Sequence, residues 1–121
     1  MANEITVSAS LRVSKGNLFE ELRKNGLQAD MSGSLVEKGV QPIGTSYEAV
    51  GIGDIGTPGH AAFVNLDNTN YVEIGVVVAS MFYPLVKISP GGTAVFELAT
   101  GTFYAQADSD TINLQKFIIE Q

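Results

Sequence analysis

Hydrophobic and polar residues alternate strictly over residues 4–14. Every second position is apolar: Ile5, Val7, Ala9, Leu11 and Val13. The positions between them are polar or charged. Because successive side chains of a strand point to opposite faces, this pattern predicts a half-buried strand.

Residues 17–26 fit two structures. In the first, Asn17 caps a short helix that has Glu20 at the capping-box position and ends at Gly26. A helix of two turns is marginal without tertiary support. In the second structure, the chain turns at Lys15–Gly16 and returns as the second strand of a hairpin.

The remainder of the chain reads as short strands separated by turn signals rich in Gly, Pro, Asn and Asp. The expected strands are 40–44, 46–52, 60–66, 71–78, 85–88, 93–99, 102–106 and 111–119. About eight short strands at intervals of roughly 8–12 residues are typical of a sandwich or barrel. The fold class expected is all-β, an antiparallel β-sandwich or a jelly-roll-like barrel, in a single domain over residues 1–121.

The alternation within these strands also predicts which side chains form the core. The residues expected to be largely buried are Val7, Leu11, Val95, Leu98, Leu114 and Ile118. Hydrophobic residues make up 45% of the chain, which is enough to build one core in a domain of 121 residues.

Charge and composition narrow the expected partners. The formal net charge is −6, and the seven basic residues are scattered along the chain, so we expect no nucleic-acid partner. The absence of cysteine excludes disulfides and thiolate zinc sites. The N-terminus lacks the pattern of a signal peptide, and the apolar run Val76–Ala79 is too short to span a bilayer. We therefore expect a soluble chain with no membrane partner.

Three motifs suggest chemistry but have simpler explanations. Gly51–Gly56 matches G-x-G-x-x-G, yet Pro58 and a predicted strand follow where a dinucleotide site needs a helix, so a turn is favoured. His60 is the single histidine and has no motif partner beside it. The oxygen-rich segments Asp67–Asn70 and Asp108–Asp110 lack the spacing of a calcium loop and favour tight turns. We expect no catalytic, cofactor-binding or metal-ligating residue, and no enzyme.

Several segments resemble small virion structural proteins of tailed bacteriophages, of the capsid-decoration or minor-capsid type. The segments that carry the resemblance are Ile43–Ile55 (IGTSYEAVGIGDI), Phe63–Gly75 (FVNLDNTNYVEIG) and Phe82–Gly91 (FYPLVKISPG). An N-terminal strand followed by Lys15–Leu18 also fits this group and favours the hairpin over the helix. The charged segment Phe19–Lys24 and the pair Gly91–Gly92 depart from its usual pattern.

The resemblance implies a β-sandwich or jelly-roll-like subunit that binds the major capsid protein and copies of itself, as a trimer or another homo-oligomer. It places the protein on the capsid exterior of a virion assembled in the bacterial cytoplasm. An acidic protein suits the exterior of a shell better than contact with packaged DNA. The alternatives are a tail, baseplate or head-fibre component, or a carbohydrate-binding sandwich used in host attachment.

The segment Met81, Phe82, Tyr83 and Pro84 is the predicted interface. Consecutive apolar side chains of a strand cannot all face one core, so part of this segment is expected at the surface. Exposed apolar patches often mark interaction sites. The alternative is a loop folded over the end of the sandwich, which buries Phe82 or Tyr83 locally.

Overall fold

The computed structural model describes residues 3–121, and the chain divides into two compact units. The first unit ends at Ser32 and the second spans Gly33–Gln121. Both consist of antiparallel strands, with no helix in the described residues. The all-β class is confirmed, whereas the single domain over 1–121 stays a prediction.

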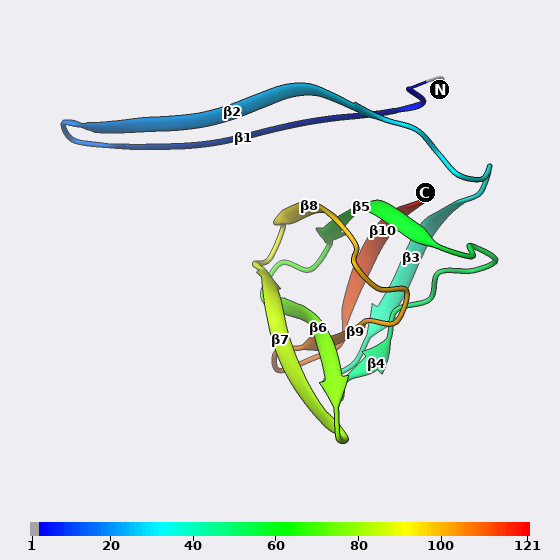
Figure 1. The fold of residues 1–121 in the computed structure, drawn as a ribbon. Helices are drawn as coiled ribbons and strands as arrows, with labels where there is room; N and C mark the ends of the chain where they lie inside the picture. The colour runs from blue at the N-terminus through cyan, green and yellow to red at the C-terminus, as the bar shows by residue number, and fades with distance from the viewer. Residues whose placement is uncertain (1–2) are drawn as a thin grey trace. The chain divides into compact units, whose positions relative to one another are not determined.

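The first unit is one long hairpin (Figure 1), formed by β1 (Ile5–Lys15) and β2 (Leu18–Ala29). Gly16 sits in the turn with a φ of 57°, a conformation that glycine adopts without steric cost. Leu11 pairs with Leu22, and Lys15 pairs with Leu18. Residues 18–26 are therefore a strand and not a helix, as the resemblance implied.

An irregularity between Val7 and Ala9 shifts the hairpin register. On the facing strand Gly26 has a φ of 70°, and its N–H donates a hydrogen bond of 3.2 Å to Ser8 Oγ. A residue inserted into one strand of a pair bends and twists the ribbon. The bulge thus marks the boundary between the Val7–Leu27 end of the hairpin and its straight distal part.

The second unit contains two four-stranded sheets. Sheet I has the order β3-β10-β5-β8 and consists of Val36–Ile43, Ile112–Glu120, Pro58–Asn65 and Thr93–Glu97. Sheet II has the order β4-β9-β6-β7 and consists of Glu48–Ala49, Tyr104–Ala107, Val72–Val78 and Met81–Ile88. The two sheets face each other across one core and do not close into a barrel (Figure 1). The β-sandwich prediction is confirmed, with ten strands in residues 3–121 where about eight were expected.

The core centres on Phe63 of β5. Its ring lies 5.6 Å from the ring of Phe96 and 6.0 Å from that of Phe103, measured between centroids. Leu114 and Ile118 are fully buried in the same core, as predicted. Alternation along β10 puts their side chains on the inner face of sheet I.

Two of the predicted core residues are wrong. Val95 is 49% exposed, because β8 turns Phe96 and its alternate neighbours toward the core. Leu11 is 76% exposed, because β1 and β2 form a two-stranded ribbon with no second layer in their own unit. Val7 and Leu98 are intermediate, and Leu98 packs against the edge of the core.

Three strand boundaries also differ from expectation. The predicted strand 46–52 shrinks to β4 (Glu48–Ala49), because the chain leaves the sheet for the glycine-rich loop. β3 begins at Val36 and so extends the expected 40–44 strand. β7 begins at Met81 and runs through Pro84, which is tolerated because β7 is an edge strand.

Candidate functional site

The Gly51–Gly56 motif is a loop between β4 and β5. The Gly51 N–H donates to Gln41 Oε1 at 3.1 Å, and the Gly56 N–H donates to Glu120 Oε2 at 3.0 Å. Gly53 has a φ of 61°, which favours glycine. The next element is β5, not a helix, so the loop lacks the helix N-terminus that holds a pyrophosphate. The turn interpretation is confirmed.

Lys116 of β10 binds the backbone of this loop. It points inward from β10, in phase with Leu114 and Ile118, and is buried. Its Nζ donates to the Gly51 carbonyl oxygen at 2.6 Å and to Gln41 Oε1 at 3.2 Å, and it lies 3.4 Å from Glu37 Oε2. Its amino group therefore finds oxygen partners from β3 and from the loop. The alternation of β10 indicates that Lys116 faces inward, but the sequence analysis did not identify Lys116 as a buried residue.

Glu120 fastens the other end of the loop. Its carboxylate accepts hydrogen bonds from the backbone N–H groups of Gly56, at 3.0 Å, and Ser34, at 3.1 Å. The Gly56 hydrogen bond is the main reason that the pKa of Glu120 lies below its ordinary value. The Glu120 carboxylate therefore has a structural role, because it fixes the backbone at the end of the Gly51–Gly56 loop.

His60 lies nearly buried at the end of sheet I. Its Nδ1 is 2.8 Å from Gln121 Oε1, and its Nε2 is 3.7 Å from Glu97 Oε1. The Gln121 side chain also accepts the backbone N–H of His60, at 3.1 Å. Residues 3–121 contain no group of three histidine or carboxylate side chains arranged to hold a metal ion. The contacts tie the C-terminal residue to β5.

The segment Asp67–Asn70 is a turn, as predicted. Asp67 Oδ2 accepts hydrogen bonds from the backbone N–H groups of Asn70 and Thr69, and the Asn70 hydrogen bond is the larger reason that the pKa of Asp67 is lowered. The fully buried amide of Asn65 donates to the carbonyl oxygens of Asn70, at 2.9 Å, and Ile88, at 3.1 Å. Asn65 thus joins this turn to the end of β7, a role that the sequence did not indicate.

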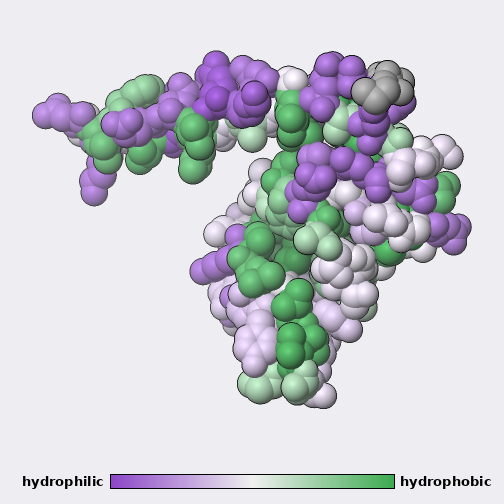
Figure 2. All heavy atoms as spheres, in the orientation of Figure 1, coloured by the Kyte–Doolittle hydropathy of each residue, from purple (hydrophilic) through white to green (hydrophobic). Residues whose placement is uncertain are grey.

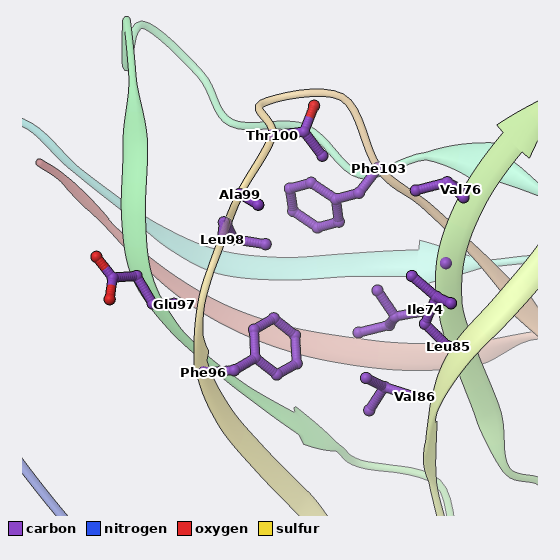
Figure 3. A pocket seen from close by; sticks show the side chains of 11 residues that line it. Ile74, Val76, Leu85, Val86, Phe96, Glu97, Leu98, Ala99, Thr100 and Phe103 are labelled. Atoms are coloured by element: carbon purple, nitrogen blue, oxygen red, sulfur yellow. The ribbon is translucent and has the colours of Figure 1, made fainter.

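An apolar cleft, which we call the seam cleft, lies between the edge strands β7 and β8 (Figure 3). It has a volume of about 400 Å³. Its walls are apolar side chains from both sheets and from the loop after β8, among them Ile74, Leu85, Val86, Phe96, Leu98 and Phe103. Figure 3 shows the Glu97 carboxylate directed away from these side chains. This arrangement suits an apolar side chain rather than a reacting substrate.

Leu85, one of the residues that line the seam cleft, is 71% exposed. β6 and β7 shift register between Ile74 and Gly75, so that Val86 and Pro84 have partners while Leu85 has none. A bulge of this kind re-aims a side chain at a sheet edge. Leu85 is therefore available at the mouth of the cleft.

The predicted interface Met81–Pro84 forms the first half of β7. Met81 is 59% and Tyr83 48% exposed, whereas Phe82 is partly buried. The Phe82 ring stacks on Tyr47 with centroids 6.1 Å apart, and Tyr47 meets Tyr104 edge-on at 5.9 Å. One part of the segment is thus packed locally and another part is at the surface. Its role as an interface stays a prediction.

The hairpin carries a second apolar surface, the hairpin face, made of Leu11, Val13, Leu18 and Leu22. The strand register places these four residues on one side of the ribbon. The other side carries pairs such as Arg12 with Glu21. Figure 2 shows hydrophobic side chains gathered along the hairpin. Alternation over residues 4–14 placed Leu11 and Val13 on one face, as observed, but the sequence analysis expected Leu11 in the core.

Comparisons with protein-family models, with curated proteins and with solved structures give no match to this chain. Within residues 3–121 there is also no helix long and apolar enough to cross a membrane. The apolar surfaces are therefore the main guide to function.

Proposed function

We propose that this protein is a structural subunit of a tailed-phage virion. In this proposal it is a capsid decoration or minor capsid protein that binds the major capsid lattice in many copies. The proposal is supported by the resemblance of Ile43–Ile55, Phe63–Gly75 and Phe82–Gly91 to virion proteins of that type. The β-sandwich fold agrees with what the resemblance implies.

The observation that carries the proposal is that the described part of the first unit consists of a single two-stranded hairpin. Two strands alone have no layer against which to bury a face, and an isolated hairpin is at best marginally stable in water. Yet β1 and β2 are long and place four large aliphatic side chains on one side. Such an element gains its stability by packing on something outside its own unit, which is the behaviour expected of an assembly subunit.

The polar groups of the sandwich support the same role. His60, Lys116 and Glu120 are the side chains that a search for chemistry would select. Each is engaged with backbone or side-chain partners that hold a loop or a chain end. Their geometry explains rigidity of the subunit rather than turnover of a substrate.

The net charge of −6 supports a place on the outside of the shell. A negatively charged surface is repelled by packaged DNA, and the basic residues of the sandwich, Lys38, Lys87 and Lys116, lie on different strands. Lys116 is buried in its contacts with the loop. The proposed partners are accordingly the major capsid protein and other copies of the chain, without nucleic acid.

The test is co-sedimentation with empty capsids assembled from the major capsid protein of the phage that encodes the chain. We expect saturable binding with a fixed number of copies per capsid. A matched pair of variants is Leu22→Asp, on the hairpin face, and Arg23→Asp, on the opposite side of the same strand. Loss of binding for the first variant alone is expected. Absence of wild-type binding would overturn the capsid role, and binding to purified tails instead would favour the tail component.

A carbohydrate-binding role has one observation in its favour, the surface cluster of Tyr47, Phe82 and Tyr104. Aromatic rings present amphipathic surfaces for ligands. Because the Tyr47 and Phe82 rings are stacked on each other, each has one face already in use. Specific glycan binding that is lost in Tyr47→Ala would replace the capsid proposal by host attachment.

A further inference from the structure

The side of sheet I that points away from the core is rich in apolar residues. Strand alternation turns every second residue of β3, β10, β5 and β8 outward. Outward positions of an antiparallel sheet are usually polar. In sheet I they form a surface, which we call the outer face, that includes Val36, Lys38, Val40, Ala62, Val64, Val95, Glu97, Phe117 and Ile119. An apolar surface of this kind is typical of an interaction site.

The strand register arranges the outer face in rows that cross all four strands. In one row Lys38 pairs with Phe117, Phe117 with Ala62, and Ala62 with Val95. Directly paired residues project from the same side of a sheet. Phe117 is 43% exposed, and the residue beside it in the middle of the sheet is an alanine. The centre of the outer face therefore consists of a large ring next to a small methyl group.

We propose that the outer face of one copy packs on the outer face of a second copy, about a twofold axis that runs along the strands between β10 and β5. Rotation about this axis reverses the order of the strands and leaves each row at its own level. The Phe117 ring of each copy then lies over Ala62 of the other, so that a projection meets a recess twice. The inference rests on the proposed function in that an assembly subunit meets its own copies at high local concentration.

The charges of the outer face indicate a second copy as the occupant. Lys38 and Glu97 are the exposed charged residues in the four strands of sheet I. They have opposite signs and lie on the two opposite edge strands, β3 and β8. The same twofold axis lays β3 of one copy over β8 of the other and pairs Lys38 with Glu97 twice. The outer face is thus complementary to itself in charge and in shape, as a twofold interface requires.

The size of the outer face determines how strong this contact is. Four strands at a spacing of about 4.8 Å make the face about 19 Å wide. A face of this width is smaller than a standard interface, which buries about 800 Å² on each partner. We therefore expect a reversible dimer whose population depends on protein concentration. Many copies bound to one particle strengthen such a contact.

The experiment is sedimentation equilibrium of the full-length chain over a series of concentrations. We expect a monomer–dimer equilibrium for the wild type. Lys38→Glu and Glu97→Lys should each weaken dimerisation by about tenfold, because each variant puts two like-charged pairs into the contact. The double variant with both changes restores opposite charges and should recover the affinity of the wild type. The matched control is Lys87→Glu, an exposed position on β7 of sheet II, which should dimerise like the wild type.

Two results would overturn the inference besides a wild-type chain that stays monomeric. One is a double variant that associates no better than the single variants. The other is dimerisation that is lost in Leu22→Asp, on the hairpin face, and is unaffected by Lys38→Glu. The capsid co-sedimentation test is run on the same proteins. Capsid binding by a chain that does not dimerise contradicts only the dimer, whereas dimerisation without capsid binding contradicts only the virion role.

Discussion

Lys116 Nζ donates a hydrogen bond of 2.6 Å to the carbonyl oxygen of Gly51. This contact joins the inner face of β10 to the glycine-rich loop, and it explains why a charged residue occupies a position that alternation reserves for the core. A buried ammonium group is tolerated when its hydrogen-bonding capacity is used. The Gly51–Gly56 loop, whose sequence resembles a nucleotide-binding motif, is thus bound to Gln41 of β3 and to Lys116 of β10.

The first prediction concerns this lysine. Lys116→Met should lower the free energy of unfolding by about 1–3 kcal/mol, because the Gly51 carbonyl oxygen loses the Lys116 donor and Gln41 Oε1 keeps only the Gly51 N–H. Urea unfolding measures the change. The matched control is Lys38→Met, an exposed position on the adjacent strand of the same sheet, which should change it by less than about 0.5 kcal/mol. Equal effects of the two variants would contradict the proposed anchoring.

The second prediction separates the two units. Leu114→Ala should lower the free energy of unfolding of the sandwich by about 2–5 kcal/mol, because Leu114 is fully buried in its core. Leu11→Ala should leave that value nearly unchanged in dilute monomer, because Leu11 is mostly exposed. The unfolding of both variants is followed by near-UV circular dichroism of the sandwich aromatics. A large loss for Leu11→Ala would show that the hairpin belongs to the sandwich core.

The contrast between Leu11 and Leu114 also shows how far the sequence predicts the fold. Alternation identifies a strand and the side on which its apolar residues lie, and it does so correctly for both. It does not tell whether a second layer covers that side, because burial depends on contacts between distant segments. Residues 17–26 illustrate the same limit, since Leu18 and Leu22 fit a helical face and a strand face equally well.

Sequence analysis predicted the candidate sites that local residues form, and it missed those that distant segments form together. The turn at Asp67–Asn70 follows from local backbone preferences and was predicted. The seam cleft is built by β6, β7, β8 and a loop that lie far apart in the sequence, so no local pattern indicates it. Asn65 is buried by partners on two other segments and gave no signal for the same reason.

The third prediction concerns acid stability. Because the Gly56 N–H lowers the pKa of Glu120, the ionised carboxylate stabilises the folded state. The contribution of the ionised Glu120 carboxylate to the free energy of unfolding is complete above its ordinary pKa of 4.5. It is lost as the pH falls through the lower pKa that Glu120 has in the folded protein. The stability difference between the wild type and Glu120→Gln should therefore shrink below pH 4.5. Urea titrations at pH 7 and pH 3 test this.

The control for the acid experiment is Asp54→Asn, in the same loop. Asp54 is exposed, and its substitution should change the free energy of unfolding at pH 7 by less than about 0.5 kcal/mol. A difference between wild type and Glu120→Gln that stays constant from pH 7 to pH 3 would contradict the role given to the Glu120 carboxylate.

The fourth prediction tests the Met81–Pro84 interface. Tyr83→Asp should stay folded, with a change within about 1 kcal/mol, because the Tyr83 side chain is half exposed on an edge strand. It should nevertheless fail to join particles or oligomers. Phe82→Asp should instead lose stability, because Phe82 packs against Tyr47. Normal folding together with normal incorporation of Tyr83→Asp would remove Tyr83 from the interface.

The most direct test of the central claim is a cryo-electron microscopy reconstruction of virions from the phage that encodes this chain. Our account predicts repeated density on the outside of the capsid that fits the two four-stranded sheets. Density for the sandwich confined to the tail or baseplate, or its absence from purified virions, would contradict the assignment.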